Sequence, residues 1–233
     1  MAGLQVGCRG FPVARDRYFR ELGAVEVSDT RSRLPRLETA RRWRAEAPDG
    51  FVFSLVAPAA ITHTSEGSPR AADATGHFRD APPVRRAWEA FEAVIDAVQP
   101  RFVVFETPPS FYNHANYIKD MYAFFRAARR GTATFVWARH GGGWEARVLA
   151  KVAKDLGLLL ASDPLNGAEP EGRMRYLRVA GRVVDKRIVR QTAFSDPELK
   201  TILHAGGSGP SVAFLGNSDC WRDAKRLRAM GAA

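Results

Sequence analysis

Two charged residues stand inside runs of apolar residues, where a charge is unexpected. Glu26 is flanked by valines, and Arg178 lies between Leu177 and Val179. Removing a charge from water costs several kcal/mol, so each of the two needs a partner. Two interpretations stay open: Glu26 and Arg178 form an ion pair inside the protein, or they face a ligand.

Acidic and histidine side chains near the ends of other apolar runs are candidates for proton transfer. Glu26, Glu106 and Asp163 are candidate general acid–base residues. His63 and His140 are candidate proton shuttles or ligands. A histidine in a loop is also typical of a solvated side chain, so the two interpretations of His63 stand side by side. We expect Glu26, Glu106 and His63 to be the catalytic residues if the protein is an enzyme.

A second set of residues could hold a substrate. The planar guanidinium groups of Arg9, Arg139 and Arg178 match the geometry of phosphate and carboxylate groups, so these arginines could together bind an anion. Alternatively, some of them pair with Glu26, Glu106 or Asp163. The candidate substrate-binding residues are Arg9, Arg139, His140, Trp144, Arg178 and Asn217. No spacing of His, Cys, Asp and Glu indicates a metal site, and no motif indicates a cofactor, so we expect neither.

Eight short apolar runs must position these side chains, and most are followed by a helical pattern. Such alternation predicts parallel strands joined by βαβ crossovers, and eight strands in 233 residues favour a closed (β/α)8 barrel of the TIM type. The predicted strands are Leu4–Gly7, Ala24–Val27, Phe51–Leu55, Phe102–Phe105, Thr134–Trp137, Leu158–Ala161, Tyr176–Val179 and Val212–Leu215. The predicted helices are Arg17–Leu22, Glu38–Glu46, Val84–Val98, Asn116–Ala128, Glu145–Leu156, Pro197–Leu203 and Asp219–Met230.

Two stretches depart from this alternation. Ser162–Arg175 is rich in turn-forming residues, which predicts a missing or irregular helix between the sixth and seventh strands. Ala57–Pro83 is long and rich in Pro, Gly, Ser and Thr, which fits either a lid over a binding site or a surface insertion. No linker divides the chain, so we expect one domain over residues 1–233. In a barrel the carboxyl ends of the strands meet at one rim, where Glu26, Glu106, Arg139, Arg178 and Asn217 are expected to gather.

The composition of the chain limits which partners and which cellular location we expect. The formal net charge is +10, which favours a polyanionic partner, although the basic residues are spread along the chain. There is no apolar run long enough to span a membrane and no signal peptide pattern, so we expect a cytoplasmic protein without a membrane partner. Cys8 and Cys220 have no metal or redox spacing and are expected to be reduced thiols. The sequence gives no oligomeric state.

The order of short motifs along the chain resembles the YecE-like family, also called domain of unknown function 72. The matching pieces span nearly the whole chain. They are Val6–Phe11, Val25–Val27 with Thr30 and Leu34-Pro35, Thr39 with Arg42-Trp43, Pro48 and Gly50-Phe51 with Phe53, Ala57-Pro58, Ile61–His63, Phe105 with Thr107–Phe111, Arg139-His140 with Trp144, Tyr176 with Arg178 and Gly181, and Phe214 with Asn217 and Asp223-Ala224. The resemblance implies a variant TIM barrel. The family has no established activity, although a loose relation to sugar isomerases has been suggested.

Several positions differ from the pattern of that family. Val56 replaces a lysine, Glu106 replaces a glutamine, and Ala180 replaces a histidine. Trp137-Ala138 stands where the family has a carboxylate. Thr30–Ser32 replaces Thr-Phe-Tyr, and Gly216 replaces one of two asparagines. These differences imply a divergent substrate or a loss of activity.

Three hypotheses follow. The first is an enzyme acting on a phosphorylated or otherwise anionic, sugar-like molecule by carboxylate acid–base chemistry at the rim. The second is a barrel that binds or processes nucleic acid, with Phe11, Trp144 and Trp221 stacking on bases. The third is a divergent binding protein without catalysis.

Overall fold

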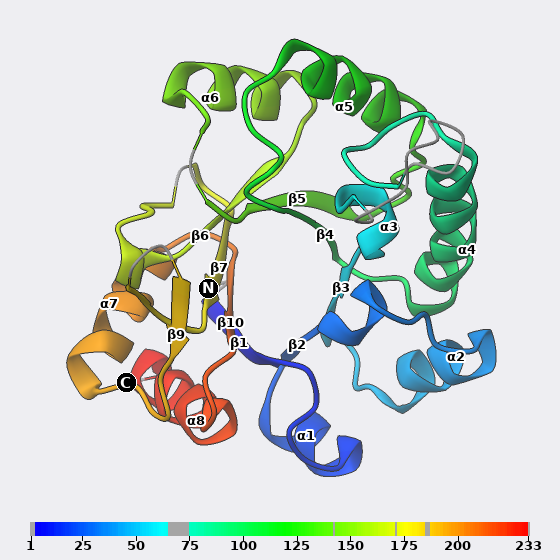
Figure 1. The fold of residues 1–233 in the computed structure, drawn as a ribbon. Helices are drawn as coiled ribbons and strands as arrows, with labels where there is room; N and C mark the ends of the chain where they lie inside the picture. Colours follow the sequence, from blue (N-terminus) through cyan, green and yellow to red (C-terminus); the bar gives the residue numbers. More distant parts are fainter. Residues whose placement is uncertain (1–2, 65–74, 142, 171, 185–186, 233) are drawn as a thin grey trace. The chain divides into compact units, whose positions relative to one another are not determined.

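The computed structural model describes residues 3–64, 75–141, 143–170, 172–184 and 187–232. Eight parallel strands close into a barrel in the order β1-β10-β7-β6-β5-β4-β3-β2, with helices between them (Figure 1). This confirms the α/β fold of the (β/α)8 type expected from the alternating pattern. The barrel strands are β1 (Leu4–Arg9), β2 (Ala24–Val27), β3 (Val52–Val56), β4 (Phe102–Thr107), β5 (Thr134–Arg139), β6 (Leu159–Ser162), β7 (Arg175–Val179) and β10 (Ser211–Leu215).

The helices follow the predicted ranges with small shifts at their ends, except the short helix Ala59–Thr62, which was not predicted. They are α1 (Arg15–Glu21), α2 (Leu37–Glu46), α3 (Ala59–Thr62), α4 (Pro82–Val98), α5 (Ala115–Ala127), α6 (Ala146–Asp155), α7 (Asp196–Gly206) and α8 (Cys220–Ala232), with the 3-10 turns η1 (Ser28–Arg31) and η3 (Pro164–Asn166). Within the described part of the connection from β6 to β7, η3 is the only helical turn, as expected from its turn-forming residues.

Three differences from the sequence prediction matter for the site. Strands β1, β4 and β5 run on to Arg9, Thr107 and Arg139, so the candidate residues Arg9, Glu106 and Arg139 belong to the strands instead of following them. A two-stranded antiparallel hairpin, β8 (Gly181–Val184) and β9 (Arg187–Arg190), follows β7 and was not predicted. The long segment after β3 contains the short helix α3, while residues 65–74, on which the lid hypothesis mainly rests, lie outside the described residues.

The chain forms two compact units. The first comprises residues 1–28, 46–54 and 159–233, and the second comprises residues 29–45 and 55–158. The prediction of one domain over residues 1–233 stays a prediction. Both cysteines, Cys8 and Cys220, are buried free thiols of the first unit.

The core of each unit explains why its strands form. Every residue of β4 and β10 is buried, as expected for parallel strands covered on both faces. In the second unit, α4 buries a stripe of residues spaced three and four apart, which include Val84, Trp88 and Phe91. Trp88 packs edge-on against Phe135 of β5, with ring centroids 6.0 Å apart. This packing anchors the strands whose ends carry the candidate residues.

Candidate functional site

The first unit holds a buried carboxylate enclosed by hydrogen-bond donors. Glu26 is fully buried on β2. Its Oε1 accepts hydrogen bonds from Arg9 Nε at 2.8 Å and from Arg178 Nη2 at 2.9 Å, while its Oε2 accepts from Arg178 Nε at 2.7 Å. The Tyr176 hydroxyl also donates to Oε2 at 2.8 Å, and the Ser54 hydroxyl lies 2.7 Å from Tyr176 Oη. The ion pair between Glu26 and Arg178, one of the two interpretations of these residues, is therefore present.

The positive charges of the neighbouring arginines keep Glu26 ionised. Burial alone would raise the pKa of this carboxyl, but Arg178 and Arg9 outweigh burial, so its pKa is lowered. Glu26 is thus a carboxylate at neutral pH. Burial and the adjacent Glu26 raise the pKa of Tyr176, so its hydroxyl stays protonated and donates a hydrogen bond to Glu26. Sequence analysis named Tyr176 only as part of the family pattern and did not name Ser54, because neither residue type stands out within an apolar strand.

The second unit gathers another set of polar residues around Glu106. Glu106 lies on β4 and is 6% exposed. Its Oε2 lies 3.0 Å from Arg31 Nε, and its Oε1 lies 3.5 Å from His140 Nε2. The Arg31 Nε is close enough for an ion pair, but its N–H has no hydrogen-bond acceptor in suitable geometry among the described residues. Arg31, on η1, was noted in the sequence only as a departure from the family pattern.

His63 joins this group through Arg31. Arg31 Nη2 lies 3.0 Å from His63 Nε2, and the Thr62 hydroxyl lies 2.8 Å from His63 Nδ1. A guanidinium can only donate, so Nε2 is the acceptor and Nδ1 carries the hydrogen of a neutral ring. Burial, followed by the charge of Arg31, lowers the pKa of His63, which agrees with that assignment. The structure thus brings together Glu106, His63 and His140, three residues that sequence analysis placed on separate elements.

Arg139 lies next to His140 but leaves the strand in another direction. Thr107 pairs with Arg139 in the register of β4 and β5, and Trp137 donates its indole N–H to the Thr107 hydroxyl at 2.9 Å. Since side chains alternate along a strand, Arg139 shares the face of Trp137, opposite to that of Glu106. No hydrogen bond or ion pair of the Arg139 side chain occurs among the described residues. Burial lowers its pKa, although part of the side chain is exposed.

Trp144 and Asn217 take part in contacts within the protein. The Trp144 indole donates to the backbone oxygen of Phe111 at 2.9 Å, which links the loops after β4 and β5. In the first unit, Asn217 is 4% exposed, and its Nδ2 donates to Asp223 of α8 at 2.7 Å and to the backbone oxygen of Thr192 at 3.0 Å. Asn217 Oδ1 is buried and has no hydrogen-bond partner among the described residues. Substrate binding by Trp144 and Asn217 stays a prediction.

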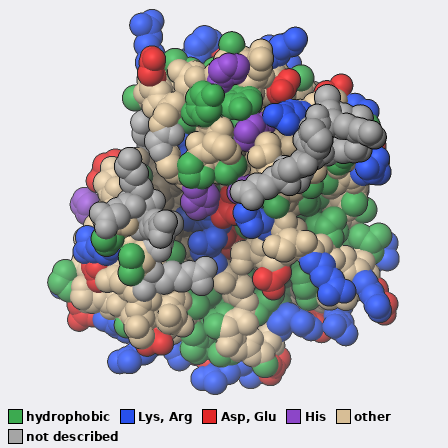
Figure 2. All heavy atoms as spheres, in the orientation of Figure 1, with side chains coloured by type: hydrophobic (Ala, Val, Ile, Leu, Met, Phe, Trp, Pro, Cys, Tyr) green, Lys and Arg blue, Asp and Glu red, His purple; other side chains and the backbone are tan. Residues whose placement is uncertain are grey.

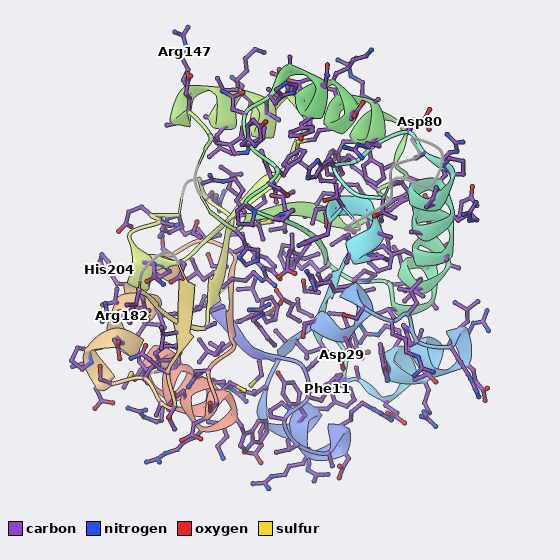
Figure 3. The ribbon with its side chains drawn as sticks, in the orientation of Figure 1. Phe11, Asp29, Asp80, Arg147, Arg182 and His204 are labelled. Carbon is purple, nitrogen blue, oxygen red and sulfur yellow. The ribbon has the colours of Figure 1, made fainter. Side chains whose placement is uncertain are left out.

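The aromatic residues proposed to stack on nucleic acid pack against other rings. Phe11, beside α1, contacts Tyr18 with ring centroids 5.1 Å apart (Figure 3). Trp221 lies 5.5 Å from the Tyr18 ring, and Trp144 lies 4.8 Å from Trp137. Lys and Arg side chains are spread over the face in Figure 2, with acidic side chains among them. Nucleic-acid binding also stays a prediction, without one basic patch on this face to support it.

Among the described residues, no three His, Cys, Asp or Glu side chains come together in a way that could hold a metal ion. None of the helices in the described ranges combines the length and the apolar character that a membrane span needs.

Solved structures of other proteins resemble this chain in fold. A DUF72 family protein from Enterococcus faecalis shares 14% identity and superposes with a TM-score of 0.73, covering 100% of this chain and 99% of the other. A DUF72 family protein from Thermotoga maritima shares 13% identity with a TM-score of 0.71, covering 99% and 100%. These likenesses show the fold alone.

No protein with a curated description matches the sequence. The family model described as "Protein of unknown function DUF72" matches residues 14–230, nearly the whole chain and the same family as the YecE-like proteins that the motifs resemble. The chain therefore belongs to the DUF72 family.

Proposed function

We propose that this protein is an enzyme that transfers protons on an anionic, sugar-like small molecule, with Glu106 and His140 as its acid–base pair. The observation that supports this most is the contact between the buried Glu106 carboxylate and His140 Nε2 at 3.5 Å. A carboxylate in this position orients an imidazole and stabilises its protonated form, as general bases require. His140 keeps 39% of its side chain exposed, so a ligand can reach it.

Arg31 and His63 support the pair in this proposal. Arg31 Nε lies 3.0 Å from one oxygen of Glu106, which leaves the other oxygen toward His140. His63 accepts a hydrogen bond from the same guanidinium and is held neutral by burial and by Arg31. In this arrangement His63 fixes Arg31, and Arg31 fixes Glu106. His63 then serves better as a positioning residue than as the proton shuttle expected from the sequence.

The anionic character of the ligand is supported by Arg139. Its guanidinium has no carboxylate partner among the described residues, and burial lowers its pKa. An anion bound there would compensate this charge through a two-pronged contact. Arg139 leaves β5 on the face opposite to that of Glu106, so the anionic group would bind at a distance from the reacting carbon.

Glu26 takes a different role in the proposal. Both of its oxygens accept hydrogen bonds, from Arg9, Arg178 and Tyr176. A carboxylate engaged in this way is poorly suited to exchanging protons, whereas it holds two guanidinium groups in fixed positions. We therefore assign Glu26 to positioning Arg9 and Arg178, the remaining candidate anion-binding arginines.

The experiment uses a panel of five- and six-carbon aldose and ketose phosphates with the matching unphosphorylated sugars. Binding is measured by calorimetry, and proton transfer by incorporation of deuterium from D₂O into C–H positions, followed by proton NMR. We expect phosphorylated members to bind and to exchange. Glu106→Gln and His140→Gln should lower the exchange rate roughly 100-fold or more while binding persists.

The anion contact is tested by Arg139→Gln, which should weaken binding of phosphorylated members about 10-fold or more. Arg147→Gln is the matched control, because Arg147 is exposed on α6 and points away from the ribbon (Figure 3). Equal binding of phosphorylated and neutral sugars, or no binding by any member, would overturn the proposed substrate class. Binding without exchange in the unaltered protein would favour the third hypothesis, a non-catalytic binding protein.

A further inference from the structure

A serine and a histidine outside the Glu106–His140 pair lie in contact in the second unit. Ser110 Oγ is 3.2 Å from His77 Nε2. Ser110 is exposed in the loop after β4, whereas His77 is 2% exposed. The hydroxyl therefore has solvent on one side and a buried imidazole on the other. Sequence analysis identified neither residue as a site.

The backbone that carries His77 is held in an uncommon conformation. Gly76, His77 and Phe78 have φ angles of 79°, 54° and 58°, three successive residues in the left-handed region. Their N–H groups donate in turn to the backbone oxygens of α3 residues 60, 62 and 61. A Cβ at Gly76 would lie 2.2 Å from the carbonyl carbon of His63, so only glycine fits there. Strained non-glycine residues of this kind cluster at active sites and ligand clamps.

The second ring nitrogen of His77 is unusual as well. His77 Nδ1 is buried and has no hydrogen-bond partner among the described residues. Buried side-chain polar groups almost always have a partner, so an orphaned one calls for a functional reason. Burial, with a smaller contribution from Arg79, lowers the pKa of His77 to about 4. The ring is neutral at pH 7, and in the tautomer that carries its hydrogen on Nδ1, the Nε2 atom accepts the hydroxyl proton of Ser110.

Aromatic rings surround this contact. The His77 ring centroid lies 4.4 Å from that of Tyr117 and 5.4 Å from that of Phe111. Tyr112, two residues after Ser110, is 46% exposed and packs edge-on against Tyr117 at 5.5 Å. The exposed ring of Tyr112, in the same loop as Ser110, offers a surface on which a planar ring can lie. The chemistry thus favours a ligand with an aromatic group next to the reacting centre.

We propose that Ser110 is a nucleophile toward activated acyl groups such as aryl esters, and that His77 accepts its proton. Ser110 Oγ forms a bond to the carbonyl carbon while its proton moves to His77 Nε2. Cleavage of the bond from that carbon to the phenol oxygen releases the phenol, which takes the proton from His77. Water then hydrolyses the acyl-serine to a carboxylic acid and restores the hydroxyl. No carboxylate contacts His77 Nδ1 among the described residues, so turnover is slow compared with that of a full triad.

The test is labelling with an alkyl fluorophosphonate, which forms a stable adduct on serines activated by a histidine. Peptide mass spectrometry locates the adduct and gives its rate of formation. In the unaltered protein we expect Ser110 to react at least 10-fold faster than Ser218, another exposed serine, which provides a comparison within one molecule. Ser110→Ala should remove the fast adduct, and Ser218→Ala should leave its rate unchanged.

His77→Asn tests the base, because asparagine tolerates the left-handed backbone better than other residues. It should slow labelling of Ser110 at least 10-fold, with circular dichroism checking the fold. Equal rates at Ser110 and Ser218 in the unaltered protein would overturn the proposal, whatever the stability of the His77 variant. An unchanged rate in a folded His77→Asn protein would overturn it as well. Neither result depends on the Glu106–His140 proposal.

Discussion

Replacement of Glu26 by glutamine is expected to destabilise the protein by about 3–5 kcal/mol, since it leaves buried cationic groups without their counter-ion. The magnitude follows from the contacts. The carboxylate accepts one hydrogen bond from Arg9, two from Arg178 and one from Tyr176, and it is fully buried. Glutamine keeps one acceptor oxygen and turns an N–H₂ group toward the remaining donors. Equilibrium unfolding in urea, followed by circular dichroism, measures the loss.

A double-mutant cycle with Arg178→Gln tests the reasoning more sharply. The two residues share a hydrogen-bonded pair, so the double variant should be more stable than the sum of the single losses by about 2 kcal/mol. Glu46→Gln is the control, because its ion pair with Arg15 is exposed and should contribute less than about 1 kcal/mol. Additive losses, or a loss at Glu26 no larger than that at Glu46, would refute a strongly coupled buried network.

The pH dependence of Glu26 gives an independent check. Its pKa in the folded protein is below the ordinary value of 4.5. The unfolded chain therefore takes up the proton first as the pH falls, and the stabilisation present above pH 4.5 is lost below it. The difference in stability between the unaltered protein and Glu26→Gln should shrink as the pH falls below 4.5. A difference that stays constant down to pH 3 would show that the charge of Glu26 is not what stabilises the fold.

Further expectations concern other parts of the molecule. Burial would raise the pKa of Glu198, but hydrogen bonds, chiefly from Ser195, lower it from 4.5 to about 2. The stabilisation present above pH 4.5 should therefore be lost as the pH falls toward 2, and Glu198→Gln should flatten this dependence in thermal melts. The pKa of His77 is lowered from 6.5 to about 4, so the histidine stays neutral in the folded protein at pH values where the unfolded chain takes up a proton. The stability of the unaltered protein should therefore fall as the pH drops from 6.5 to 4. The urea midpoint of His77→Asn should vary less over that range than the midpoint of the unaltered protein. Gly7→Ala should destabilise by more than about 3 kcal/mol in thermal melts, because its methyl group would lie 2.1 Å from a backbone oxygen of β2, whereas Gly3→Ala, with no atom within 4 Å, should change little.

The barrel could be predicted because parallel strands buried on both faces read as continuous apolar runs. The run Phe102–Phe105 marks β4, and Thr134–Trp137 marks β5. Apolar character alone predicts the ends of these two strands too early, because the last residues at their carboxyl ends are polar. Glu106 and Arg139 continue the ladder of paired residues, although their side chains carry charge. Apolar runs thus locate the strands but underestimate their length at the carboxyl end, where the candidate site begins.

Other features depend on tertiary approach and leave little pattern in the sequence. The β8–β9 hairpin has strands of only four residues, Gly-Arg-Val-Val and Arg-Ile-Val-Arg, a length at which periodicity is weak. Arg31 pairs with Glu106 from a 3-10 turn that has no sequence period of its own. The contact of Ser110 with His77 joins residues 33 positions apart, through a backbone conformation that glycine at position 76 alone suggests. Such contacts are set by how loops fold back on the strands.

The two strand carboxylates looked equivalent in the sequence, and their surroundings separate them. Glu26 accepts hydrogen bonds at both oxygens within a fully buried network, so a change in its protonation would disrupt several contacts at once. Glu106 instead lies 3.5 Å from His140, whose side chain is 39% exposed and within reach of a ligand. Proton transfer requires a group that changes charge without dismantling its support. By that criterion we propose Glu106 with His140 for acid–base chemistry, and Glu26 for holding Arg9 and Arg178 in position.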